Sequence, residues 1–129
     1  MASPISVTLA PRDPPAAVVS LAGEHDAYSA DRLESELGVL LEEGRRIVVD
    51  LRDAEFIDST TLGVLLRARQ QAEAAGLGFT LVLSERDYTQ VHQLLELTGL
   101  GTAFAIFPTL DEALSAARAG QARSVRTAA

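Results

Sequence analysis

The stretch Phe56-Ile57-Asp58-Ser59-Thr60-Thr61-Leu62 places an acid and three hydroxyls where an extended segment turns into a helix. Residues 47–51 before it are typical of a buried strand, and residues 62–70 after it show the leucine spacing of a helix. Asp58 and Ser59 are therefore predicted at the N-cap and in the first turn of that helix. Free backbone N–H groups and the positive end of the helix dipole favour negative charge there, which suits a phosphate.

The same polar residues have a simpler interpretation. Asp, Ser and Thr are among the residues that cap helices best, so Asp58, Ser59 and Thr60 would stabilise a helix N-terminus in any protein. The turn by itself leaves capping and phosphate chemistry both open.

Outward from this turn, short apolar runs alternate with helical patterns. Runs typical of β-strands lie at residues 5–9, 18–21, 47–51, 79–83 and 104–107. Helices are predicted from Ser29 to Gly44, from Ser59 to Gly76, from Glu85 to Thr98 with Ser84 as the cap, and from Thr109 through a Thr-x-x-Glu capping box. This alternation predicts an α/β fold with a mostly parallel sheet, to which the first two strands add an antiparallel edge.

Length and composition fit one domain. The chain has 129 residues, of which 47% are hydrophobic and 22% are charged. Residues 1–118 are assigned to the domain, and residues 119–129, which offer little to bury, are predicted to be a disordered tail. The apolar runs are too short to span a membrane and the N-terminus has no signal pattern, so we expect a cytoplasmic protein.

Missing residue types exclude several function classes. The chain has no cysteine, which rules out disulfides, thiol nucleophiles and thiolate metal sites. Its net charge of −7 argues against direct binding of nucleic acid, which needs a positive surface. The lack of lysine beside abundant alanine and arginine is typical of a GC-rich bacterial genome.

Three segments together resemble a known family. Gly23-Glu24-His25-Asp26 comes first, Asp58-Ser59-Thr60 follows, and Leu-Leu-Glu-Leu-Thr-Gly-Leu occupies residues 94–100. In this order and spacing, from residue 18 to residue 114, the chain resembles the STAS domain of anti-sigma factor antagonists. The resemblance implies a STAS fold, with a single mixed, mostly parallel sheet of about five strands and about four helices.

The resemblance also implies a function. The serine after the motif aspartate is phosphorylated in this family by an anti-sigma factor that is also a serine kinase, and that position is Ser59, with Thr60 as the second candidate. The unphosphorylated protein would bind the anti-sigma factor and free a sigma factor, and a phosphatase would reverse the modification. Bacterial transcription regulation, such as a stress response, follows. Thr61 stands where the family has glycine, and its β-branched side chain is expected to crowd the kinase.

A partner surface is predicted around the serine. In the helix after Ser59, the leucines at positions 62, 65 and 66 should pack on the sheet, whereas Val64 falls on the opposite side and is expected to be exposed. Gly63 would let a partner approach, and Val64 would give it an apolar anchor, although an exposed valine can also mean nothing. The predicted partner-binding residues are Glu24, Asp26, Asp58, Ser59, Thr60, Gly63, Val64 and Arg67.

An enzymatic role finds little support. A serine hydrolase would need Ser59 activated by His25 or His92, but Ile57 and Thr61 occupy the places of the glycines in a nucleophile elbow. Both histidines are instead predicted at the surface, His25 in a loop and His92 on a helix.

Metal and nucleotide sites are also not expected. Glu24, Asp26 and Asp58 could be imagined around Mg²⁺, but clustered acids on loops are more often solvated surface. No Gly-rich phosphate loop with lysine is present. We therefore predict no catalytic residue, no metal and no cofactor. The alternative to a phosphorylated antagonist is a structural or scaffold STAS domain within a larger signalling or transport assembly.

Overall fold

Strands rich in valine, leucine and alanine form the main sheet of the computed structural model, which describes residues 4–124. The strands are β1 (Ile5–Ala10), β2 (Ala16–Leu21), β4 (Arg46–Asp50), β6 (Phe79–Val82) and β7 (Ala105–Phe107). They lie in the order β1-β2-β4-β6-β7, and only the β1–β2 pair is antiparallel. The predicted five-stranded, mixed and mostly parallel sheet is confirmed.

A second, two-stranded sheet lies beyond the carboxyl ends of β2 and β4. It pairs β3 (Gly23–His25) with β5 (Ala54–Ile57) in parallel. This pair departs from the single sheet predicted above, because segments of three and four residues are too short to show an alternating pattern. These short strands lead directly into the first two helices of the chain.

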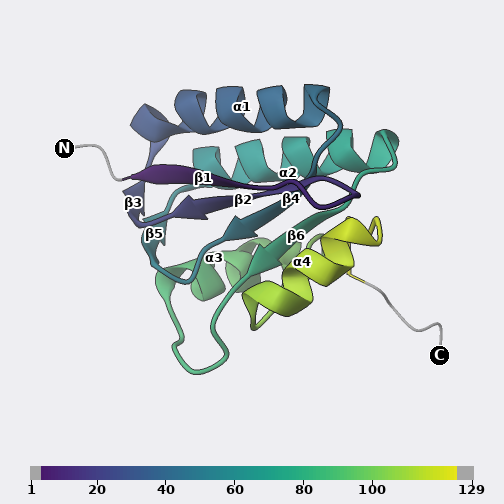
Figure 1. Cartoon of the computed structure of the whole chain (residues 1–129). Helices are drawn as coiled ribbons and strands as arrows, with labels where there is room; N and C mark the ends of the chain where they lie inside the picture. Colours follow the sequence, from purple (N-terminus) through teal and green to yellow (C-terminus); the bar gives the residue numbers. More distant parts are fainter. Residues whose placement is uncertain (1–3, 125–129) are drawn as a thin grey trace.

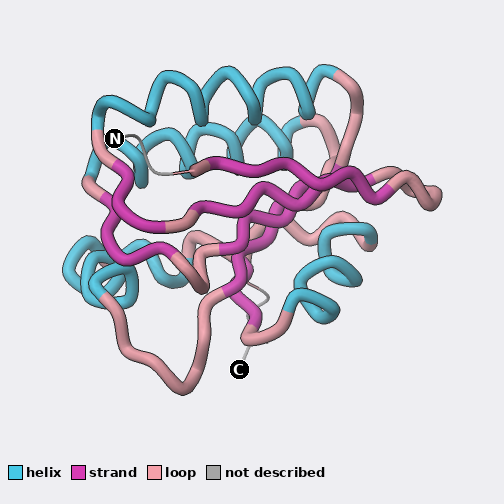
Figure 2. The backbone as a smooth tube through the Cα atoms, turned by 60° about the vertical axis from the view of Figure 1, so that its left-hand side comes forward, coloured by secondary structure: helices cyan, strands magenta, loops and turns pink. Residues whose placement is uncertain are grey.

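Helices cover both faces of the main sheet. They are α1 (Ala27–Glu42), α2 (Ser59–Ala74), α3 (Gln90–Thr98) and α4 (Leu110–Arg118), with a 3₁₀ turn, η1, at Leu100–Thr102. Figure 1 shows α1 and α2 side by side on one face and α4 on the other, and Figure 2 shows the same layers after rotation. The prediction of about four helices is confirmed. None of the helices within residues 4–124 is both long and apolar enough to cross a membrane.

The two faces of the sheet bury different cores, because successive strand residues point to opposite sides. Ile47 and Val49 of β4 belong to the larger core under α1, α2 and α3. Val48, between them, belongs to a smaller core with Ala113 and Ala117 of α4. The two α4 side chains that are fully buried against the sheet are alanines, which lets this helix lie close to it.

The third helix begins later than predicted. It starts at Gln90 with Thr89 as N-cap, not at Glu85. Ser84, the predicted cap, uses its Oγ to accept the N–H groups of Arg86 and Asp87 at 3.1 and 3.4 Å, which closes a turn instead of opening a helix. Residues 84–89 therefore form a loop in front of α3.

The chain after α4 returns to the sheet. The Phe79 N–H donates to the Gln121 carbonyl at 2.9 Å, Ala122 is buried, and Arg123 Nε donates to Glu73 Oε2 at 2.6 Å. Residues 119–124 thus make ordered contacts, although the sequence analysis placed them in a disordered tail because they hold few apolar side chains. Residues 125–129 of that predicted tail lie outside the described residues.

Gly78 permits the close approach of α4, and its substitution tests that packing. A Cβ at Gly78 would collide with the backbone carbonyl of Ala117. We expect Gly78→Ala to lower the free energy of unfolding by about 1–3 kcal/mol through overpacking. Gly38 in α1 is the matched control, since a Cβ there meets nothing within 4 Å, and Gly38→Ala should add about 0.5–1 kcal/mol of stability. Urea denaturation measures both, and equal effects would contradict the close packing.

Candidate functional site

The backbone carbonyl of His25 fixes the start of α2. It accepts the Asp58 N–H at 3.1 Å and the Thr61 hydroxyl at 3.3 Å. His25 also lies opposite Ile57 in the β3–β5 pairing. The segment that carries Glu24 and Asp26 is therefore held beside the first turn of α2, as the sequence analysis predicted from the motif order.

The ring of His25 is fully buried, so its predicted place in a surface loop is wrong. Its Nε2 lies 2.9 Å from the Ala22 carbonyl, and its Nδ1 lies 3.1 Å from Ser29 Oγ. Because a carbonyl can only accept, Nε2 carries the proton and donates it to Ala22. The histidine thus ties β3 to α1 and is a structural residue.

Two aspartates cap the two helices that begin at this end of the molecule. Asp26 is the N-cap of α1 and accepts the Tyr28 N–H at 2.9 Å. Asp58 is the N-cap of α2 and accepts the Thr61 N–H at 2.8 Å, which confirms its predicted position. Both helices start at the same end, as Figure 1 shows. Their positive dipole ends therefore act on the same region.

Ser59 and Thr60 are exposed in the first turn of α2. The amides of a first helical turn have no partner within the helix, so the N–H groups of Ser59 and Thr60 can serve an anion outside it. The Ser59 hydroxyl is thus accessible and lies at a place where added negative charge is tolerated.

Thr61 does not crowd Ser59, contrary to the sequence analysis. Its side chain is fully buried, and its hydroxyl donates to the His25 carbonyl. The extra bulk relative to the glycine of the family pattern points into the protein. The expected obstruction of a kinase by Thr61 is therefore wrong.

Val64 is also misplaced by the sequence analysis. Only 4% of its surface is exposed, and it belongs to the larger core. A helix that packs on the sheet alone would leave Val64 outside, whereas α2 packs on the sheet with one side and on α1 with another. Val64 cannot be an exposed anchor for a partner.

Thr60, Gly63 and Arg67 form the outward-facing row of α2 at spacings of three and four residues. Gly63 is half-buried, and a Cβ there would meet only the mobile end of Arg67, 3.4 Å from its Nη1. Arg67 is exposed and pairs with Glu34 of α1 at 3.2 Å. This row has the outward orientation predicted for it, and its contact with a partner stays a prediction.

Two exposed aromatic side chains flank the site, and the sequence analysis missed both. Tyr28 is 95% exposed and Phe56 is 39% exposed. Tyr28 lies two residues after Asp26 and donates its N–H to that cap, and Phe56 lies opposite Glu24 in the β3–β5 pairing. Phe56 alternates with the buried Ile57, which is the strand signal that would have revealed its outward direction. We call Glu24, Asp26, Tyr28, Phe56, Ser59, Thr60, Gly63 and Arg67 the Ser59 surface.

Gln90 braces the strand that leads into this surface. Its Oε1 accepts the Ile57 N–H and its Nε2 donates to the Ile57 carbonyl, both at 2.9 Å. Both backbone groups of the residue before Asp58 are thereby fixed from α3. No spacing in the sequence indicates this contact, which joins residues 33 positions apart.

His92 was predicted at the surface of its helix, but it is half-buried. Its Nδ1 accepts the Thr89 N–H at 3.0 Å, and its Nε2 lies 3.0 Å from the Ser84 carbonyl, to which it donates. Like His25, His92 uses both ring nitrogens in hydrogen bonds that hold the surrounding chain in place. The two histidines are therefore structural residues, not bases for Ser59.

An ion pair between Arg52 and Asp50 lies in the turn before β5. Arg52 donates two side-chain hydrogen bonds to the Asp50 carboxylate at 2.9 and 2.7 Å. Partial burial opposes ionisation of Asp50, but the hydrogen bonds and charge of Arg52 outweigh it and hold the pKa of Asp50 below its ordinary value. Within residues 4–124 no three acidic or histidine side chains are grouped to hold a metal ion.

Comparisons with known proteins agree with the fold and the motif. The sequence profile of the STAS domain matches residues 8–113. The anti-sigma-F factor antagonist RsfB of Mycobacterium tuberculosis is 31% identical over 124 residues, which cover 94% of this chain and 98% of RsfB. The anti-sigma-B factor antagonist of Bacillus subtilis is 37% identical over 83 residues, 64% of this chain and 72% of that protein.

A solved structure is also similar. The crystal structure of an anti-sigma factor antagonist from Mycobacterium paratuberculosis superposes with a TM-score of 0.70 at 30% sequence identity. The match covers 89% of this chain and 95% of that one. The similarity therefore extends over the whole fold and is not confined to the serine motif.

Val64→Asp tests the burial of Val64. We expect it to reduce the free energy of unfolding by at least about 3 kcal/mol, because an unpaired carboxylate would enter the larger core. Thr60→Asp, one helical turn away and exposed, is the control and should change stability by less than about 0.5 kcal/mol. Thermal unfolding measures the stability of both variants. A Val64→Asp protein as stable as wild type would show that Val64 is not buried.

Gln90→Met removes the brace on Ile57 while keeping side-chain length. We expect a loss of about 1–3 kcal/mol, because both backbone groups of Ile57 lose their partner. The amide hydrogen of Ile57 should also exchange with solvent faster in this variant than in wild type. Gln93→Met, on the exposed side of the same helix, is the matched control. Unchanged exchange at Ile57 would show that the brace is not needed.

Proposed function

The chain belongs to the STAS domain family, and we propose that it acts as an anti-sigma factor antagonist controlled by phosphorylation of Ser59. In this proposal the unphosphorylated protein binds an anti-sigma factor that is also a serine kinase, and a sigma factor is released. Phosphorylation ends the binding, and a phosphatase restores it. The relatives named as antagonists of anti-sigma factors, at 31% and 37% identity, support the assignment.

The observation that carries the proposal is the exposure of Ser59 on the first turn of α2. Its hydroxyl is accessible to a kinase, whereas Thr61 of the same turn is fully buried. Thr60 is exposed as well and is the second candidate. A partner that binds the Ser59 surface would contact the apolar rings of Tyr28 and Phe56, which replace Val64 as anchors.

In the phosphorylation reaction this domain supplies only the acceptor hydroxyl of Ser59. The kinase brings ATP, and the Ser59 oxygen attacks the γ-phosphorus while its proton passes to a base of the kinase and ADP leaves. The product carries about −1.5 to −2 charges at neutral pH. The free N–H groups of the turn and the dipole of α2 stabilise that charge, so the fold is expected to survive.

Binding of the anti-sigma factor, in contrast, should be lost. The phosphate would join the carboxylates of Glu24, Asp26 and Asp58, and a partner shaped for a neutral hydroxyl would meet like charge, bulk and a desolvation cost. A charge buried without compensation costs about 3–5 kcal/mol, which weakens binding by roughly two to four orders of magnitude. In this proposal the protein acts where the sigma factor does, in the bacterial cytoplasm.

A scaffold STAS domain that is never phosphorylated is the second candidate. The hydrogen bond from the Thr61 N–H to Asp58 favours it, because this cap would be just as useful without any phosphate. Phosphorylation itself distinguishes the two functions.

We expect the cognate anti-sigma factor, given ATP, to add one phosphate to the wild-type protein at Ser59. The Ser59→Ala protein should gain no phosphate, and mass spectrometry measures both. Ser59→Ala should bind the anti-sigma factor constitutively, and Ser59→Asp should bind it at least about tenfold more weakly than wild type. Ser115→Asp, an exposed serine of α4 on the far face, is the control for added charge. Equal affinities for all variants would leave Ser59 as a helix residue without a switching role.

A further inference from the structure

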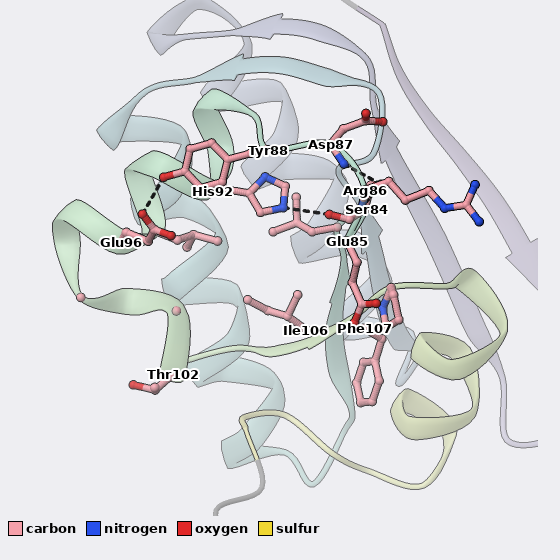
Figure 3. Close-up of a pocket in the computed structure, with 15 residues that line it drawn as sticks. Ser84, Glu85, Arg86, Asp87, Tyr88, His92, Glu96, Thr102, Ile106 and Phe107 are labelled. Carbon is pink, nitrogen blue, oxygen red and sulfur yellow. Dashed lines mark hydrogen bonds between the residues drawn. The ribbon is translucent and has the colours of Figure 1, made fainter.

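A cavity of about 560 Å³ opens between the 84–89 loop, α3, η1 and the ends of β6 and β7 (Figure 3). Its volume is within the range of pockets that hold small organic ligands. It also lies at the carboxyl ends of two parallel strands, where open α/β sheets commonly bind ligands. None of its lining residues belongs to the Ser59 surface.

The floor of this cavity is apolar. Leu83 and Leu95 are buried beneath it, and Ile106 and Phe107 of β7 are half-buried beside it. Such a floor accommodates a flat hydrocarbon or aromatic group, whose transfer from water is favourable.

An aromatic wall stands on the α3 side. The rings of Tyr88 and His92 are stacked, with centroids 5.4 Å apart and an interplanar angle of 26°. The bonds of His92 to Thr89 and Ser84 keep its ring in place. Tyr88 lines the cavity and is 65% exposed, so its ring is accessible to a ligand there.

Negative charge lines the rim on opposite sides. Glu96 Oε2 accepts the Tyr88 hydroxyl at 2.5 Å, and this bond raises the pKa of Tyr88, so the phenol stays neutral. Glu85 comes from the loop and faces the cavity near Phe107 in Figure 3. The nearest cation, Arg86, extends away from the cavity in the same view. The carboxylate of Asp87 also points away in that view, so the charges directed at the cavity are the carboxylates of Glu85 and Glu96.

We propose that this pocket binds a small organic cation with a flat apolar body. The apolar body would lie on the Leu83, Leu95 and Ile106 floor, and the cationic group would lie between the carboxylates of Glu85 and Glu96. The exposed face of Tyr88 adds a cation–π contact. An anion of the same shape would be repelled by the rim and by a chain whose net charge is −7.

Three indole compounds of similar size test the charge requirement. Tryptamine is the cation, 3-ethylindole the neutral analogue and indole-3-propionate the anion. The chain has no tryptophan, so indole fluorescence reports the probe alone. We expect tryptamine to bind with a dissociation constant of about 1 mM, as its size allows, and to shift the amide signals of residues 83–88, 92–102 and 106–107 in nitrogen-15 NMR spectra.

The neutral analogue should bind about three- to tenfold more weakly than tryptamine, and the anion should not bind measurably. Shifts located elsewhere, equal affinity for all three probes, or no shift with tryptamine at about 10 mM would each overturn the proposal.

Isosteric variants identify the carboxylates. Glu85→Gln and Glu96→Gln should each weaken tryptamine binding about three- to tenfold, and the amide oxygen introduced by Glu96→Gln can still accept the Tyr88 hydroxyl. Glu42→Gln, at the end of α1, makes the same change of net charge away from the pocket and should bind like wild type. Ser59→Ala should also bind like wild type, so this result is independent of the proposed antagonist function. Equal binding by the Glu85, Glu96 and Glu42 variants would show that the rim charges do not select the ligand.

Discussion

The two hydrogen bonds accepted by the His25 carbonyl decide where the serine motif stands. They attach the first turn of α2 to the end of β3, and the buried ring of the same residue attaches β3 to α1. Elements separated by a whole helix in the sequence thereby meet at one point. The two aspartate caps, the exposed aromatic rings and the Ser59 hydroxyl all take their relative positions from this junction.

α2 combines a rigid body with an accessible first turn. Leu62, Val64 and Leu65 are buried between the sheet and α1, while Ser59 and Thr60 extend beyond both. A charge added at the first turn acts on helix amides that point outward, not on the core. A modification there can therefore change what the surface binds without changing what holds the fold together.

The sequence predicted the features that depend on local pattern. The five strands, their mostly parallel arrangement and the Asp58 cap follow from periodicity and residue preference within a few positions. The errors concern contacts between distant segments. The burial of Val64 depends on its contact with α1, and the strand that contains His25 exists only through its pairing with β5, more than 30 residues later. The Gln90 brace joins residues 33 positions apart and leaves no trace in local spacing. The cavity beside α3 depends on a loop that the sequence analysis had assigned to a helix.

The packing of α4 has a consequence for the order of folding during synthesis. Val18, Val48 and Val82, from three adjacent strands, are covered by Ala113 and Ala117, which the ribosome adds after every strand of the sheet. A nascent chain that has already formed the α1 and α2 layer still presents this valine stripe to its surroundings. Emergence of α4 from the ribosome is then the step that covers this stripe, and a chain that stopped before α4 would leave it exposed to chaperones or proteases.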